Sequence, residues 1–234
     1  MAIKCLCVDF GNVIAFFDHQ QACNELAKLS KERFTGNELY NDLFQESGLE
    51  QKYDNGSITT NQFIKMIKKK YKLKGRSKKI KNIWCDIFSK NNLMIELLQR
   101  LTNHRYDLIL ASNTNELQYK WFKKKFKNEL NIFKEEVISF QIKHCKPERA
   151  FFEECIQKSG FKACECIFID DRSEFVNAAT DAGMKGIKYT SIEVLLKDLE
   201  KLGVIDKTFL NSFNTPVIQP RKKITDADKE IYLT

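Results

Sequence analysis

The sequence predicts an α/β protein in which a parallel sheet carries helices on both faces and a helical segment interrupts the sheet after its first strand. Short apolar runs that end in polar residues alternate with helical stripes over most of the chain, as expected for a parallel sheet. Between residues 16 and 88 no strand is apparent, and apolar residues recur at helical spacing, as at Phe63, Ile64 and Ile67. At 234 residues the chain can form one large domain or a core plus an insertion.

The first strand is expected near residues 3–8, where a short apolar run leads to Asp9 and a Gly-Asn turn. Such runs are typical of strands that are buried on both faces of a parallel sheet. The turn places Asp9 at the carboxyl end of the strand, which is the edge where open α/β sheets bind ligands. A carboxylate there can coordinate a hard cation or act as a nucleophile, although a simpler interpretation is an Asp that only ends the strand.

The remaining elements follow in order along the chain. Helices are expected in the inserted segment at residues 18–29, 37–45, 59–71 and 77–88. Asp18 and Thr59 can N-cap the first and third of these helices. Further helices around residues 94–101, 117–122, 151–155 and 175–179 alternate with strands at residues 108–111, 137–140, 166–169 and 185–189. Beyond residue 202 the chain is polar and holds two of its three prolines, so a packed-down or disordered tail is expected.

The formal net charge of +8 belongs to one segment of the chain. Residues 65–81 hold ten basic residues and no acidic one, whereas the rest of the chain has 29 basic against 31 acidic residues. The segment is either a solvated face or a field that attracts anionic ligands, phosphorylated ones included. No aromatic-studded strand or recognition helix accompanies it, so no nucleic-acid partner is expected. No apolar run could span a bilayer, so no membrane partner is expected and a cytoplasmic location is predicted.

The eight cysteines include two pairs with one intervening residue, Cys5/Cys7 and Cys164/Cys166, both within predicted strands. Zinc sites more often use two intervening residues on a turn. Small buried thiols in a reducing compartment are therefore favoured over a four-cysteine metal site.

Polar residues at three predicted strand ends can converge on one crevice. These residues are Asp9 after the first strand, Ser112 and Asn113 after a second, Asp170 and Asp171 after a third, and Lys146 at the start of a helix. Asp9 with Asp170 or Asp171 supplies the two carboxylates that typically hold Mg²⁺. The Ser112 hydroxyl and nearby backbone N–H groups suit phosphate oxygens, and the Lys146 cation can neutralise both phosphoryl group and carboxylates. Each residue has an ordinary structural interpretation, but their joint occurrence favours a phosphate-handling site.

The sequence resembles hydrolases of the haloacid dehalogenase superfamily, in the subfamily IA with a helical cap between its first and second motifs. The four motifs stand in the family's order at residues 8–13 (VDFGNV), 112–113 (SN), 146–147 (KP) and 168–171 (FIDD). The resemblance covers roughly residues 3 to 200. Within the superfamily, the sequence is similar to sugar-phosphate phosphatases with an Asp-x-Gly-x-Val first motif. It implies a Rossmann-like core at residues 1–14 and 92–205, a helical cap at residues 15–91 and a C-terminal tail at residues 206–234.

The resemblance also implies a role for each motif residue. Asp9 would be the nucleophile that forms an aspartyl-phosphate intermediate. Mg²⁺ would be held by Asp9, by the backbone carbonyl of Gly11 and by the Asp170-Asp171 pair, with Asp171 as the direct ligand and Asp170 behind it. The phosphoryl group would be bound by Ser112, Asn113 and the catalytic Lys146. The cap would close over the site, exclude water and select the leaving group.

One position departs from the family pattern. Most phosphatases of this family carry a second Asp two residues after the nucleophile, which acts as general acid and then as general base, and this sequence has Gly11 there. Loss of general acid–base help costs about 10²–10⁴-fold in rate, so phosphoryl transfer survives, best with a good leaving group such as an anomeric sugar. A cap residue is an alternative donor. Asp18 and His19 lie near the expected hinge, although Asp18 is better explained as a helix cap.

Three functions therefore compete. The leading one is a Mg²⁺-dependent phosphatase of a small phosphorylated metabolite, working as a monomer or homodimer. The second is a metal-independent haloacid dehalogenase, which also lacks an Asp at position 11 but does not require Asp170 and Asp171 beside Asp9. The third is a non-catalytic relative that binds phosphate ligands or a partner protein, for which Gly11 is the main argument. The substrate is expected to be selected by loops of the cap, and the sequence of these loops does not identify it.

Overall fold

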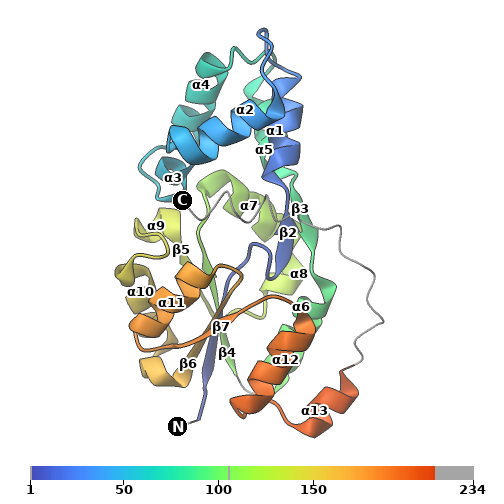
Figure 1. Cartoon of the computed structure of the whole chain (residues 1–234), viewed down its shortest axis with the longest axis vertical. Helices are drawn as coiled ribbons and strands as arrows, with labels where there is room; N and C mark the ends of the chain where they lie inside the picture. Colours follow the sequence, from blue (N-terminus) through green and yellow to red (C-terminus); the bar gives the residue numbers. More distant parts are fainter. Residues whose placement is uncertain (1, 105, 214–234) are drawn as a thin grey trace.

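The computed structural model describes residues 2–104 and 106–213, which form a layered α/β core with a helical bundle at one end (Figure 1). The main sheet has the strand order β5-β4-β1-β6-β7, and every neighbouring pair is parallel. Its strands are β1 (Cys5–Val8), β4 (Asp107–Ser112), β5 (Glu135–Ile138), β6 (Cys166–Asp170) and β7 (Lys185–Lys188). All four residues of the central β1 are buried because helices cover both faces of the sheet.

Alternate residues of β1 contribute to different hydrophobic clusters, one on each face of the sheet. Leu6 and Val8 belong to the cluster formed with α6 (Asn92–Asn103), α7 (Glu116–Lys125), α8 (Lys127–Leu130) and α12 (Ile192–Lys201). Cys5 and Cys7 belong to the cluster formed with α10 (Arg149–Ser159) and α11 (Ser173–Asp181). The short helices α9 (Ser139–Ile142) and η2 (Ala163–Glu165) complete the connections. The sheet is thus a buried middle layer, and its carboxyl edge faces the helical bundle (Figure 1).

The helical bundle lies between β1 and β4 in the sequence and has a hydrophobic core of its own. Its elements are α1 (His19–Ala27), α2 (Gly36–Asn41), the π-helix η1 (Asp42–Glu46), α3 (Leu49–Asp54), α4 (Thr60–Lys70) and α5 (Ser77–Cys85). Tyr53, Phe63 and Trp84 fill the centre of the bundle. Reciprocal capping boxes at Thr35 and Thr59 begin α2 and α4. We call this bundle the cap; the domain boundaries inferred from the sequence stay a prediction.

The α/β class, with a parallel sheet and a helical insertion, is confirmed, and Asp18 and Thr59 are the predicted N-caps of α1 and α4. The expectation of no strand between residues 16 and 88 is wrong at both ends. The strand β2 (Ala15–Phe17) pairs antiparallel with β3 (Phe88–Lys90), so the two chain crossings between core and cap run side by side. Three-residue strands are too short to show alternation in a sequence, and their pairing joins segments far apart along the chain.

Two further segments differ from the expectation. The strand predicted at residues 137–140 ends at Ile138, because the Ser139 hydroxyl accepts a hydrogen bond from the Thr114 amide (2.9 Å) and α9 begins there. The helix α3 was not expected, since six residues carry too little periodicity. In the predicted tail, α13 (Lys207–Ser212) packs on the core through Phe209 and Phe213, and residues 214–234 lie outside the described part of the chain.

The basic segment 65–81 comprises the C-terminal half of α4, the turn after it and the N-terminal half of α5. Most of its side chains are exposed. Lys70 pairs with Asp42 at 2.6 Å across the cap surface. A solvated face and a field for anionic ligands both remain compatible with this placement. No helix among residues 2–104 and 106–213 is both long and apolar enough to cross a membrane.

The cap core predicts a large effect for Trp84→Ala. Trp84 is fully buried, so its removal should lower the free energy of unfolding by about 3–5 kcal/mol. Met66→Ala is the control in the same bundle, because Met66 is 45% exposed and its loss should cost within about 0.5 kcal/mol. Urea denaturation of the full chain measures both; similar losses for the two variants would contradict a separately packed cap core.

Candidate active site

The first part of the site is the turn that follows β1. The Asp9 amide donates to the Ile169 carbonyl of β6 (2.9 Å), which holds Asp9 at the carboxyl edge of the sheet. Asn12 adopts a left-handed conformation with φ of 54°, which asparagine tolerates better than most residues. Phe10 stacks on Phe122 of α7 with ring centroids 3.9 Å apart and so anchors the turn from below. The turn after β1 is thus held by several contacts and positions the Asp9 carboxylate at the sheet edge.

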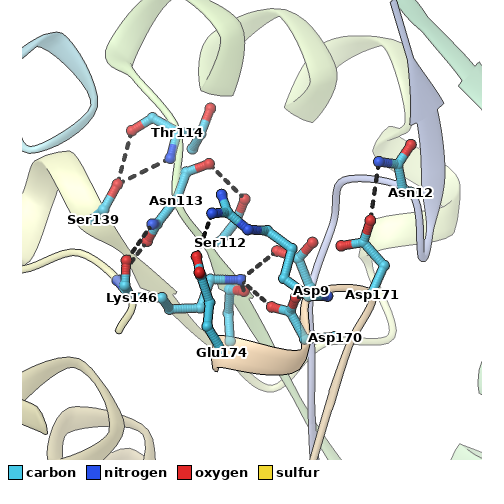
Figure 2. Close-up of polar contacts among 12 residues, drawn as sticks. Asp9, Asn12, Ser112, Asn113, Thr114, Ser139, Lys146, Asp170, Asp171 and Glu174 are labelled. Atoms are coloured by element: carbon cyan, nitrogen blue, oxygen red, sulfur yellow. Dashed lines mark hydrogen bonds and ion pairs between the residues drawn. The ribbon is translucent and has the colours of Figure 1, made fainter. Parts of the chain in front are cut away.

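Lys146 occupies the centre of the site (Figure 2). Its ammonium donates to Asp9 Oδ1 (2.7 Å), Asp170 Oδ2 (2.6 Å) and the Ala111 carbonyl (3.2 Å), which uses all three of its N–H groups. The side chain is 1% exposed. Burial opposes the charge, but the two carboxylates outweigh it and raise the pKa of Lys146 above its ordinary value. Lys146 is therefore a permanent cation in contact with two of the three acidic groups.

Asp9, Asp170 and Asp171 form a carboxylate group that suits a metal ion. One ligand oxygen from each lies within 4.8 Å of the others, and among the described residues this is the only such group of three or more. Burial raises the pKa of Asp9 to about 8, with Lys146 opposing the shift and Asp170 and Asp171 adding to it. Burial and the neighbouring Asp170 likewise raise the pKa of Asp171 to about 6, against the hydrogen bond from Asn12. Three hard oxygen donors facing one lysine fit a divalent cation such as Mg²⁺, which would relieve their repulsion.

The two residues of the second motif differ in their hydrogen bonding: the Ser112 hydroxyl makes only a weak contact, whereas the Asn113 side chain is fully engaged. Ser112 ends β4, is 3% exposed, and its hydroxyl makes only a long contact of 3.4 Å with the Asn113 carbonyl. The Asn113 side chain accepts from the Lys146 amide (2.8 Å) and donates to the Lys146 carbonyl (2.9 Å). This two-way clamp fixes the backbone that carries Lys146. A phosphoryl-binding role for Ser112 and Asn113 stays a prediction, and the structure gives Asn113 a positioning role besides.

Gly11 lies against Asp9 and a cap-side phenylalanine. A Cβ added at Gly11 would lie 2.7 Å from Phe17 Cε1 and 3.6 Å from Asp9 Oδ2. An aspartate there would therefore have to displace the Phe17 ring. The Gly11 carbonyl stays the predicted third metal ligand.

The two donors suggested by the sequence are both engaged elsewhere. The Asp18 carboxylate accepts from the Gln21 amide (2.8 Å) as the N-cap of α1. The His19 ring lies among Phe17, Phe44 and Trp84, and burial lowers its pKa to about 3. His19 is therefore neutral near pH 7 and carries no readily released proton.

The structure adds residues that the sequence reasoning missed. Asp54 at the end of α3 accepts from the Asn115 side-chain amide (2.9 Å), and its carbonyl accepts from the Ser139 hydroxyl (2.6 Å). Glu50 lies one helical turn before Asp54 on α3. No local signal identifies this group, because it forms only when α3 docks on the ends of β4 and β5.

The chain belongs to the haloacid dehalogenase-like hydrolase family, whose pattern matches residues 14–188. The family expected from the four motifs is confirmed, as is the Rossmann-like parallel core. Asp9, Ser112, Lys146 and Asp170 lie together at one sheet edge, as the motif order implied (Figure 2). The protein is thus a hydrolase of this family.

The chain is similar to one plant protein over a short stretch of sequence and to two solved bacterial structures over most of its length. Chloroplast flavin mononucleotide hydrolase 1 of Arabidopsis thaliana is 41% identical over 59 residues, which is 25% of this chain and 24% of the plant protein. Two bacterial structures share the fold. A HAD family enzyme from Bacteroides thetaiotaomicron, solved with magnesium and inorganic phosphate, has a TM-score of 0.71 at 23% identity over 82% of this chain and 96% of its own. A predicted HAD-like hydrolase from Porphyromonas gingivalis has a TM-score of 0.73 at 18% identity over 86% and 98%.

The half-buried His19, whose ring lies among aromatic side chains, predicts a specific acid sensitivity. Its pKa lies near 3 in the folded chain and near 6.5 in an ordinary setting, so between these pH values only the unfolded chain takes up the proton. Stability should therefore fall as the pH drops through this window, by up to about 1.4 kcal/mol per pH unit from this group. His19→Phe should flatten the dependence in urea denaturation series. The matched control is His104→Gln, an exposed histidine; equal slopes for wild type and His19→Phe would show that the ring is not buried as described.

Proposed function

We propose that the protein is a Mg²⁺-dependent phosphatase that hydrolyses a small phosphorylated metabolite through an aspartyl-phosphate on Asp9. The observation that carries the proposal is the Asp9 carboxylate itself. It lies at the carboxyl edge of a parallel sheet, shares a buried lysine with Asp170, and belongs to a three-carboxylate group. An oxygen nucleophile surrounded by one fixed cation and a metal-binding set is suited to attack on a phosphorus atom.

The roles of the residues follow from their contacts. Lys146 holds Asp9 in place, and its positive charge would attract the phosphoryl oxygens. The buried Ser112 hydroxyl is free to donate to one of those oxygens. Asp170 is occupied by Lys146 and by the Arg172 amide (2.9 Å), which favours Asp171 as the direct metal ligand and Asp170 as the group behind it.

Mg²⁺ would be held by Asp9, the Gly11 carbonyl and Asp171, and when bound it would withdraw negative charge from the phosphoryl group. The remaining steps use the chain's own residues. Asp9 attacks in line, the phosphorus–oxygen bond to the leaving group breaks, and water later releases phosphate from Asp9. The cap lies over this edge and limits the entry of water.

The relatives support this class of substrate without fixing its identity. The plant relative is named for hydrolysis of flavin mononucleotide, and the Bacteroides enzyme was solved with magnesium and phosphate. A sugar phosphate and a larger phosphate monoester are both consistent with these names. The carboxylate group argues against a metal-independent dehalogenase, which needs only the nucleophile. A cytoplasmic location and a monomer or homodimer stay predictions.

Asp9→Asn tests this proposal. The amide is a poor nucleophile, so hydrolysis of an aryl phosphate should fall by several orders of magnitude while the circular dichroism spectrum is unchanged. Asp181→Asn, an exposed aspartate of α11, makes the same chemical change and should keep full activity. Chelation of divalent metal should abolish the wild-type rate, and Mg²⁺ should restore it. Undiminished turnover in Asp9→Asn, or in chelated wild type, would refute the mechanism.

A further inference from the structure

Among residues 2–104 and 106–213, the motif residues at the sheet edge offer no proton donor for a leaving group. Position 11 is a glycine, and the Phe17 ring occupies the space that a side chain there would need. Lys146 stays charged and is bonded to three acceptors. Asp18 caps a helix and His19 is buried as a neutral ring. An alkoxide leaves poorly without a proton, so a donor from another element is required for ordinary esters.

The carboxyl end of α3 is fixed above the ends of β4 and β5. Asp54, which is 9% exposed, receives a hydrogen bond from Asn115, three residues beyond the end of β4. Its carbonyl receives the hydroxyl hydrogen bond of Ser139, the residue that follows β5. In Figure 1, α3 lies at the core-facing side of the cap next to α9.

Glu50 extends this anchoring toward the other side of the nucleophile. It is hydrogen-bonded to Asp54, one turn or about 6 Å along the helix, and it interacts electrostatically with Arg172, which follows β6 by two residues. The sheet order places β1 between β4 and β6, with adjacent strands about 4.8 Å apart. Interactions with Asp54 near the end of β4 and with the charge of Arg172 beyond β6 direct the Glu50 side chain toward the end of β1, which carries Asp9. Glu50 is half-buried and so still reachable by a ligand.

The surroundings of Glu50 favour a bound proton. Burial and the adjacent Asp54 raise the pKa of Glu50 well above its ordinary value, and Arg172 only partly opposes them. Burial also raises the pKa of Asp54. A further titratable neighbour is the Cys145 thiol, which stays neutral because burial raises its pKa to about 12. Two carboxyl groups in contact disfavour the state in which both are ionised. The Glu50–Asp54 pair can therefore hold a proton beside the site.

We propose that Glu50 is the catalytic proton donor to the leaving-group oxygen and that Asp54 positions it, in place of the acid missing at position 11. This rests on the proposed phosphatase function. As Asp9 attacks phosphorus, the bond from phosphorus to the leaving oxygen breaks with its electron pair on that oxygen, and the Glu50 proton moves there to give an alcohol. The Glu50 carboxylate then takes a proton from the water that attacks phosphorus in the aspartyl-phosphate. Phosphate and Asp9 are released, and Glu50 is protonated again.

The test is a leaving-group series on Glu50→Gln, the full chain being used throughout with saturating Mg²⁺. The parameter kcat/KM reports the steps up to departure of the leaving group. For simple alkyl phosphates it should fall by about 10²–10⁴-fold, and for 2,4-dinitrophenyl phosphate it should change by less than about threefold, because that phenolate needs no proton. The plot of log kcat/KM against leaving-group pKa should therefore become steeper. Glu46→Gln, an exposed glutamate of the same cap, should leave the slope unchanged.

The outcomes separate this inference from the proposed function. If Glu50→Gln slows the alkyl and dinitrophenyl esters by the same factor, or slows neither, Glu50 is not the donor, although the phosphatase proposal stands. If wild type fails to hydrolyse even the dinitrophenyl ester with Mg²⁺, the phosphatase proposal fails and the inference falls with it. The folding of Glu50→Gln is checked separately by its circular dichroism spectrum, and Asp54→Asn provides a second measurement. It keeps a hydrogen-bonding side chain beside Glu50 and should steepen the slope less than Glu50→Gln does.

Discussion

Lys146 is buried with its ammonium between two carboxylates, and the rest of the site depends on that contact. Removing one lysine and two acids from water is costly unless each is paired, and here three N–H groups meet three oxygen acceptors. The strand ends must therefore stay in register. The Asn113 clamp on the Lys146 backbone adds a second restraint from β4. A charge that is costly to bury thus holds Asp9 in place, which favours a preorganised nucleophile over a flexible one.

The cap joins the core at separate places, and each has a different physical basis. The β2–β3 pair is a backbone ladder, which lets both chain crossings bend together. The α3 contact is polar, with Asp54 bonded to Asn115 and Ser139 at the strand ends. A polar contact at the edge of a site can be exchanged for water more readily than an apolar one, which would suit a cap that opens to admit the proposed substrate. The cap core around Trp84 is a separate hydrophobic cluster.

The strands of the main sheet and the motif residues can be predicted from the sequence because each carries a local signal. A buried parallel strand is a continuous apolar run, and Asp9, Ser112 and Asp170 stand directly at the ends of such runs. Other parts depend on tertiary contacts. Asp18 could be foreseen as a cap, whereas the desolvation of His19 required the rings around it. The six residues of α3 are too few to show a helical period in the sequence. A role for Glu50 and Asp54 becomes apparent only when α3 is placed at the sheet edge. The β2–β3 pairing was likewise invisible because it is non-local.

The central claim is that Asp9 itself takes up the phosphoryl group. Reductive trapping tests it most directly, because borohydride converts an aspartyl-phosphate to homoserine without affecting a free carboxylate. The enzyme would be mixed with Mg²⁺ and an aryl phosphate, quenched within the first turnovers, reduced and digested for peptide mass spectrometry. Homoserine at position 9, absent when substrate is omitted, is the predicted result. Homoserine at Asp170 or Asp171, or active turnover with no homoserine at any position, would contradict the account.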